Sequence, residues 1–237
     1  MKKLLLFLVP LILLACTPDE SQFKSTVPVT RPPLEERMAE VPQTESMSSA
    51  LPDSINLDVP FYPQAPDADW GMPWQEACEE ASIALAYHYF SEPELTKEQF
   101  KKDIFGLVDW QNEHLGDYKH STVDQTAEIL EGYFGFTDYR VVKNPTIEDL
   151  KKELAAGHLI VAPFAGRMLG NPFYSGEGPY YHMMVLKGYD STNFITNDVG
   201  TKRGLNFIYP YQTIMNALHD YHETAIQTAP QKVIVME

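Results

Sequence analysis

Cys78 and His182 are the two residues of this chain whose chemistry and placement could serve a covalent reaction. Cys78 lies at the start of a stretch predicted to be helical, and His182 interrupts an apolar run, 181–186, predicted to be a strand. A thiol attacks as its thiolate, and a free thiol pKa of about 8.5 leaves little thiolate at neutral pH. A helix N-terminus and a histidinium both favour the charged sulfur. The pair therefore indicates a cysteine nucleophile with a histidine base.

Each residue alone has a simpler explanation. A single thiol in a helix is commonly buried and inert, and a histidine in an apolar strand is commonly a packed core residue. The chain has two cysteines, and the other, Cys16, ends an N-terminal apolar run, 4–15. If Cys16 carries lipid, Cys78 has no disulfide partner within the chain. Only the combination of the lone thiol and the downstream histidine indicates catalysis.

A third residue is needed to orient the imidazole, and two neighbours compete for that role. Asn197 and Asp198 end a predicted strand, 193–198, that should pair with the strand of His182. Side chains alternate between the faces of a sheet, so a two-residue turn at 191–192 would place Asn197 on the face of His182. A three-residue turn or one bulge would place Asp198 there instead. The residues alone leave both registers open.

The chain resembles the papain-like cysteine peptidases, in particular the group related to the double-glycine leader peptidases that process bacteriocin precursors. The resemblance covers about residues 55–235. It rests on four segments, which are 59–64, the tract around Cys78, 181–190 and 194–198. The resemblance implies a triad of Cys78, His182 and Asp198, with Asn197 as the alternative third member.

The resemblance also implies an oxyanion hole built with a glutamine that precedes the nucleophile. Gln64 matches the motif position and is favoured, while Gln75 is nearer in sequence but has a different context. The chain departs from the group directly after the cysteine. Glu79 and Glu80 follow Cys78 where the group commonly has Gly-Pro. Two carboxylates favour the start of a helix but oppose a thiolate, which leaves the reactivity of the thiol open.

The N-terminus predicts export and lipid attachment. Lys2 and Lys3 precede the apolar run 4–15, which is too short to span about 30 Å of hydrocarbon and is typical of a signal peptide. The segment Leu13-Leu14-Ala15-Cys16 resembles the lipobox of bacterial lipoproteins. That resemblance implies cleavage before Cys16 and lipid on this residue. The alternative is an ordinary secretory signal with an incidental cysteine.

Composition divides the chain into three parts. Residues 1–15 are the predicted lipoprotein signal peptide. Residues 16–51 hold the lipidated cysteine and a tether rich in Pro, Ser, Thr and Glu, which cannot bury enough apolar surface to offset the entropy of ordering. Residues 52–237 are long enough for one domain with a sizeable core. This domain is the part that resembles the peptidases.

The predicted fold class is α+β, with a helical part first and an antiparallel sheet after it. The nucleophile is expected at a helix N-terminus, and the histidine and aspartate on the sheet. The helices are expected from 75–78 to 89–90, from a Thr96 cap to Ile104, from 121–122 to 132–135, and from a Thr146 cap to Gly157. Strands are expected at 136–142, 158–163, 181–189, 193–197, 205–209 and 232–235, with a further helix after Pro210.

The formal charge of −15 argues against a nucleic-acid partner, because phosphate binding needs a basic surface. We expect no cofactor and no metal, since the chain has neither a glycine-rich phosphate loop nor a clear metal-ligand set. The expected partners are a peptide or protein substrate and a membrane, reached through lipid on Cys16. The sequence gives no indication of oligomeric state.

These inferences predict a membrane-tethered cysteine peptidase on the extracytoplasmic face of a bacterial cell-envelope membrane. It would hydrolyse peptide or amide bonds through a thioester acyl-enzyme. Two alternatives stay open. One is a catalytically silent papain-like domain that serves as a surface binding module. The other is an acyltransferase or transpeptidase that uses the same triad with an amine in place of water.

Overall fold

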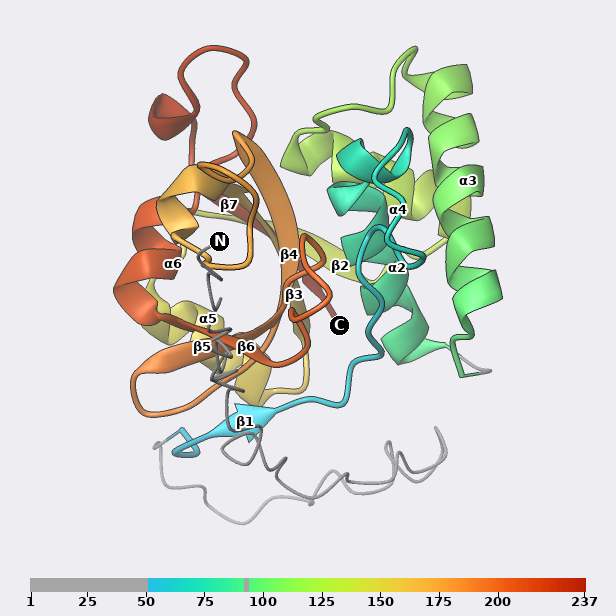
Figure 1. Ribbon diagram of the computed structural model, residues 1–237. Helices are drawn as coiled ribbons and strands as arrows, with labels where there is room; N and C mark the ends of the chain where they lie inside the picture. The colour runs from blue at the N-terminus through green and yellow to red at the C-terminus, as the bar shows by residue number, and fades with distance from the viewer. Residues whose placement is uncertain (1–50, 92–93) are drawn as a thin grey trace, which may run out of the picture. The chain divides into compact units, whose positions relative to one another are not determined.

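A computed structural model describes residues 51–91 and 94–237. The predicted signal peptide, Cys16 and nearly all of the predicted tether lie outside the described residues. In the part described, one seven-stranded sheet runs in the order β2-β7-β3-β4-β5-β6, with β1 paired to β4, and every pairing is antiparallel (Figure 1). The strands are β1 Ile55–Asn56, β2 Tyr139–Lys143, β3 Leu159–Ala165, β4 Tyr181–Tyr189, β5 Asn193–Asn197, β6 Phe207–Pro210 and β7 Lys232–Met236.

Helices cover both faces of this sheet. In Figure 1, α2, α3 and α4 gather on one side, and α5 and α6 lie on the other. The helices are α2 Cys78–Phe90, α3 Lys97–His114, α4 Val123–Phe134, α5 Ile147–Ala155 and α6 Tyr211–Ala217, with 3-10 turns η2 Trp74–Glu76, η3 Gly166–Leu169 and η4 Ile226–Thr228. This arrangement confirms the predicted α+β class.

The strand β4 divides the hydrophobic core into two clusters. Met183 and Val185 pack with the helices α2, α3 and α4, whereas Met184 and Leu186 pack with α5 and α6. This follows from the period of two in a strand, because successive side chains point to opposite faces. The strand is buried along its whole length and largely apolar, because both of its faces are covered. His182 lies in line with Met184 and Leu186.

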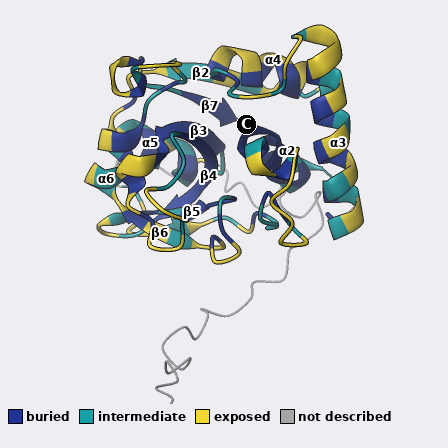
Figure 2. Ribbon diagram, turned by 45° about the horizontal axis from the view of Figure 1, so that its top comes forward, coloured by how far each residue is buried: buried dark blue, intermediate teal, exposed yellow. Residues whose placement is uncertain are grey.

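Helix α2 is held against β4 by a polar contact as well as by packing. Ser82 Oγ lies 2.7 Å from the carbonyl oxygen of Cys78 and 3.0 Å from that of Met183. The neighbouring Ala81 and Ala84 are fully buried. Figure 2 shows β3 and β4 in dark blue, while the outer side of α3 is largely exposed. The first turn of α2 is thereby fixed beside the start of β4.

The predicted helix caps at Thr96 and Thr146 are confirmed, and of the two predicted starts, Ser121 and Thr122, the structure has Thr122 as the cap of α4. Each threonine side chain accepts a hydrogen bond from the backbone N–H three residues later. The predicted end of the Thr96-capped helix at Ile104 is wrong, because α3 continues to His114. Gly106 does not interrupt the helix. Its missing side chain makes room for Tyr133 of α4, since a Cβ there would fall 2.1 Å from the Tyr133 hydroxyl oxygen.

Of the helices within 51–91 and 94–237, none combines the length and the apolar character needed to cross a membrane.

Candidate active site

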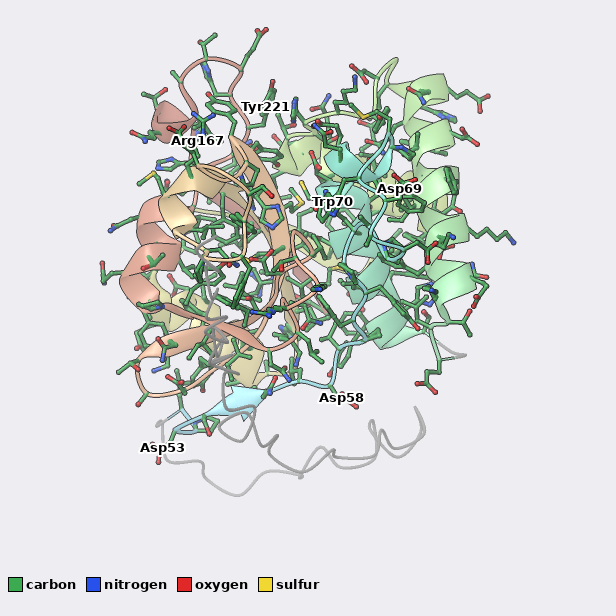
Figure 3. All side chains as sticks on the ribbon, viewed as in Figure 1. Asp53, Asp58, Asp69, Trp70, Arg167 and Tyr221 are labelled. Carbon is green, nitrogen blue, oxygen red and sulfur yellow. The ribbon has the colours of Figure 1, made fainter. Side chains whose placement is uncertain are left out.

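A pocket of about 690 Å³ opens where the first turn of α2 faces the start of β4. Cys78 and His182 both line it, as does Gln64. Trp70 also lines the pocket, and Figure 3 labels its side chain on the side of α2. The pocket therefore brings together three residues that the sequence singled out, and His182 lies more than 100 positions after the other two.

Asp198, not Asn197, is the residue that contacts the histidine. His182 Nε2 lies 2.8 Å from Asp198 Oδ1, and both side chains are buried. The turn between β4 and β5 is the two-residue one, since the Asp190 N–H donates to the Asn193 carbonyl. A bulge at Lys187 then shifts the register, so that Leu186 pairs with Thr196. The single bulge that the sequence left open is the reason Asp198 reaches the imidazole.

Asn197 points elsewhere. Its side-chain Nδ2 donates to the carbonyl oxygens of Val59 and Pro60, at 3.3 and 3.1 Å. It therefore fastens the segment before the pocket to β5. It has no contact with the imidazole among the interactions of the described residues.

Asp198 is buried but remains charged because five donors surround it. Burial alone would raise the pKa of Asp198. The charge of His182 and hydrogen bonds to the carboxylate lower the pKa to about 2. The donors are His182 Nε2, the Gly200 N–H at 3.0 Å, Asn171 Nδ2 at 2.9 Å, the Tyr174 hydroxyl at 2.7 Å and the Tyr209 hydroxyl at 2.6 Å. A fixed anion behind Nε2 leaves Nδ1 as the atom of the ring that can face a thiol.

Cys78 is the first residue of α2, as predicted, and its thiol contacts a carboxyl group. The sulfur donates to Glu79 Oε2 at 3.0 Å, and the thiol is buried. Burial raises the pKa of Cys78 well above its usual value, and the charge of Glu79 raises it further. A backbone contact from Met183 acts in the opposite direction. In this arrangement the proton resides on the sulfur.

Glu79 and Glu80 belong to a buried polar network that joins α2 to α3 and to the start of α4. Glu79 Oε1 accepts the N–H of Ser121 at 3.0 Å, and Glu80 Oε1 accepts Gln111 Nε2 at 2.5 Å. The hydroxyl of Ser121 donates to Gln111 Oε1 at 3.0 Å and closes the network. Burial raises the pKa of Glu79 to about 7, and burial with the charge of Glu79 raises the pKa of Glu80 well above its usual range.

Gln64 is buried in the wall of the pocket, while Gln75 is exposed. Gln64 Nε2 donates to the carbonyl oxygens of Trp74 and Gln75, at 2.8 and 3.1 Å. Both N–H hydrogens of the Gln64 amide therefore form hydrogen bonds with the turn that precedes Cys78. An oxyanion could accept from Gln64 only if one of these carbonyls were released.

Asn171, Tyr174 and Tyr209 hold Asp198, and reasoning from the sequence did not identify them as site residues. Asn171 and Tyr174 come from the loop before β4, whose Gly and Asn residues predict turns but not contacts. Tyr209 comes from β6, which reaches the site only through the pairing of β5 with β6. No local sequence signal identifies the three residues, because the contacts depend on tertiary structure.

One further cluster could in principle hold a metal ion. Glu153, His158 and Glu237 offer ligand atoms within 4.8 Å of one another. Arg140 contacts both carboxylates, so the cluster already has its own cation. We interpret it as an ion-pair cluster at the β2 edge of the sheet.

The fold is similar to that of solved structures. A crystal structure described as a C39-like peptidase from Bacillus anthracis aligns with a TM-score of 0.52 at 16% sequence identity, covering 78% of this chain and 98% of the other. Xylellain, a cysteine protease from Xylella fastidiosa, aligns over 79% of this chain and 87% of its own at 16% identity. Its TM-score of 0.40 is too low to support an argument. A search of curated proteins gave no significant match.

The family assignment rests on the sequence profile that matches most of the chain. The profile of the Peptidase_C39 like family matches residues 56–228, which include Cys78, His182 and Asp198. The match confirms the resemblance found in the sequence, and the fold agrees with it. The chain belongs to the Peptidase_C39 like family.

Proposed function

We propose that this chain is a cysteine peptidase that hydrolyses peptide or amide bonds through a thioester acyl-enzyme. Cys78 is the nucleophile, His182 the base and Asp198 the residue that orients the base. The observation that carries the proposal is the 2.8 Å contact of His182 Nε2 with a buried Asp198, beside Cys78 in one pocket. Membership of a peptidase family supports the same conclusion.

In the proposed mechanism each proton transfer has a named donor and acceptor. Asp198 accepts from Nε2 of His182, so Nδ1 is the basic atom and takes the proton of the Cys78 sulfur. The thiolate attacks the substrate carbonyl, and a carbon–sulfur bond forms as the carbonyl oxygen becomes an oxyanion. Collapse of this intermediate expels the amine, which takes the proton from His182. Water, deprotonated by the same ring, then hydrolyses the thioester.

The oxyanion would be stabilised at the N-terminus of α2. The backbone N–H groups in the first turn of a helix have no partner within the helix, and the helix dipole favours negative charge there. In this proposal the N–H of Cys78 is the first donor to the oxyanion. Gln64 Nε2 is the second donor in this proposal, after exchange of one backbone carbonyl for the oxyanion.

The test is the rate at which iodoacetamide labels Cys78 in the wild-type protein and in His182→Ala. We expect labelling below about pH 7 to be roughly tenfold faster in the wild type, because an imidazolium stabilises the thiolate. A screen of fluorogenic peptides with Cys78→Ala as the blank would then identify substrates. Equal labelling rates in wild type and His182→Ala at every pH would contradict a nucleophilic role for Cys78.

A second candidate function is a silent binding module with the same fold. It is favoured by the raised pKa of Cys78 and by the contact of its thiol with Glu79. In that case labelling would be slow at all pH values and independent of His182. Peptide binding to the pocket would then survive Cys78→Ala without turnover.

We further propose that lipid on Cys16 anchors the domain to a membrane, on the extracytoplasmic face of a bacterial envelope. The support is the lipobox-like sequence that ends at Cys16. Several acyl chains on one residue give stable anchoring, which one chain does not. Mass spectrometry of the N-terminal peptide would reveal the lipid, and Cys16→Ala should move the protein from the membrane fraction to the soluble fraction. An unmodified Cys16 in membrane-derived protein would contradict this proposal.

A further inference from the structure

Glu79 contacts the reacting sulfur directly, and the triad leaves it without a role. Its carboxyl group is buried and lines the pocket. Oε1 accepts the backbone N–H of Ser121 at 3.0 Å, and Oε2 accepts the thiol of Cys78 at 3.0 Å. The two oxygens are thus distinguished by their partners. Oε1 is tied to a permanent donor, and Oε2 faces a group that can itself lose a proton.

This geometry dictates where a proton on Glu79 would lie. A backbone N–H can only donate, so a neutral Glu79 must carry its proton on Oε2, pointing at sulfur. A thiolate accepts that hydrogen bond well, whereas an ionised carboxylate at the same distance repels the thiolate. A buried charge at this separation is poorly screened, and it suppresses ionisation of the thiol by more than about tenfold.

We propose that Glu79 is a further catalytic residue, whose carboxyl must carry a proton on Oε2 before Cys78 can hold its negative charge. The inference rests on the proposed function, because it concerns the same nucleophile. In the activating step the thiol proton passes from Cys78 to Nδ1 of His182. The proton of Glu79 stays on Oε2 and donates to the thiolate. No other bond changes, and the thiolate is populated on the acid side of neutrality.

Glu79 titrates in the pH range in which its charge could regulate ionisation of the Cys78 thiol. Burial raises its pKa to about 7, so its charge changes near neutral pH. The titratable groups around it come from each element packed against it, and these are Cys78 and Glu80 of α2, Glu76 of η2, His120 of the loop before α4, Tyr181 and His182 of β4, and Tyr221 of the loop before β7.

Most of these neighbours do not change the charge at the sulfur near neutral pH. Burial and the charge of Glu79 raise the pKa of Glu80 well above its usual range, which disfavours a charge on Glu80. Burial raises the pKa of Tyr181 well above its usual value. Glu76 lies 3.7 Å from His120, which offsets its charge when the imidazole is protonated. Of these groups, Glu79 is the one whose side chain contacts the sulfur.

The experiment compares iodoacetamide labelling of Cys78 in the wild-type protein, Glu79→Gln and Glu80→Gln, from about pH 5 to about pH 9. A glutamine at 79 is neutral at every pH and can donate to a thiolate. We expect Glu79→Gln to label at least about tenfold faster than the wild type at about pH 8, and to converge with it below about pH 6. Glu80→Gln is the matched control, equally buried and adjacent but not in contact with sulfur, and should follow the wild type.

A second measurement needs no variant and covers the case in which Glu79→Gln does not fold. Thiolate absorbance of the wild-type protein should pass through a maximum below about pH 7, fall, and rise again only at strongly alkaline pH. A monotonic rise would overturn the proposal. So would identical profiles for wild type and Glu79→Gln, while slower labelling in His182→Ala would still support the triad. If His182→Ala also matched the wild type, the proposed function would fail as well.

Discussion

Asp198 and Glu79 are both buried carboxyl groups of one site, yet their pKa values are shifted in opposite directions. Asp198 supports His182 and Glu79 contacts Cys78, and each has at most 1% of its surface exposed. The pKa of Asp198 is lowered to about 2, whereas that of Glu79 is raised to about 7. Burial raises the pKa of both, so burial does not explain the difference.

The number and kind of hydrogen-bond donors explain why the two pKa values shift in opposite directions. Asp198 receives five hydrogen bonds, including one from a group that can be a cation. Glu79 receives the N–H of Ser121 and a weak thiol donor, besides its own backbone N–H. Five donors keep a buried carboxylate charged, while two or three leave it able to titrate. One half of the site thus holds a permanent charge and the other a charge that depends on pH.

Removing the permanent charge of Asp198 should have the largest effect on the free energy of unfolding. Asp198→Ala deprives His182, Asn171 and two tyrosines of their acceptor, and we expect it to lower the free energy of unfolding by about 3–5 kcal/mol. Urea denaturation measures this. Asp190→Ala is a control, because Asp190 also accepts hydrogen bonds but is partly exposed, and should cost at most about 1 kcal/mol.

The pH dependence of the same measurement gives the sign of the Asp198 shift. A carboxyl whose folded pKa lies below its unfolded value stabilises the fold above the unfolded pKa. Its contribution, about 2 kcal/mol for Asp198, is lost as pH falls from about 4 through about 2. Asp198→Ala should lack this acid limb. A similar loss of stability in Asp198→Ala and Asp190→Ala would contradict the account.

Glu79 should show the opposite pH dependence. Its folded pKa lies above the unfolded value, so the wild type loses stability as pH rises from about 4.5 to about 7. Glu79→Gln removes this loss. We expect it to raise the free energy of unfolding by roughly 2–3 kcal/mol at pH 8 and to change it little at pH 4, as measured by urea denaturation. A variant that is less stable than the wild type at pH 8 would show that the donors around Glu79 outweigh the cost of burying its charge.

The variant Gly204→Ala tests whether the position of Asp198 depends on close packing of the loop that follows β5. A Cβ at this position would fall 1.7 Å from the carbonyl oxygen of Asp198, whose N–H donates to the Gly204 carbonyl at 3.0 Å. Gly204→Ala must therefore displace the loop after β5. We expect a cost of about 2 kcal/mol in thermal or urea unfolding, together with slower labelling of Cys78 below about pH 7. Unchanged labelling in a destabilised variant would mean that His182 does not depend on this loop.

The local parts of the fold could be predicted from the sequence. The caps at Thr96 and Thr146, the strands 181–189 and 193–197 and the helix start at Cys78 depend on neighbouring residues. The structure has these features as predicted. The bulge at Lys187 depends on distant residues. At the adjacent Gly188, the backbone of Ile55 in β1 approaches so closely that a Cβ would fall 2.1 Å from the Ile55 carbonyl oxygen.

The residues of the site also divide into those that local sequence identifies and those that depend on distant contacts. Cys78 and His182 could be identified from residue type and element, while the choice of Asp198 over Asn197 needed the family resemblance, because register depends on that bulge. The opposition of Glu79 to a thiolate followed from its position in the sequence. The hydrogen bond between Glu79 and the sulfur could not be predicted from the sequence. The five donors to Asp198 could not be predicted either, since they come from loops and strands far apart in the chain.

Thr146→Ala should have the smallest effect and separates stability from reactivity. Thr146 and Asp149 form a capping box at the start of α5, on the face of the sheet opposite α2. Loss of the cap should lower the free energy of unfolding by about 1 kcal/mol, as measured by urea denaturation. Labelling of Cys78 should keep the wild-type pH profile, because neither Asp198 nor Glu79 contacts this helix. If the profile moved, α5 would influence the pocket through the sheet. The effects of Asp198 and Glu79 variants would then have to be compared at equal stability before the two carboxyl groups could be contrasted.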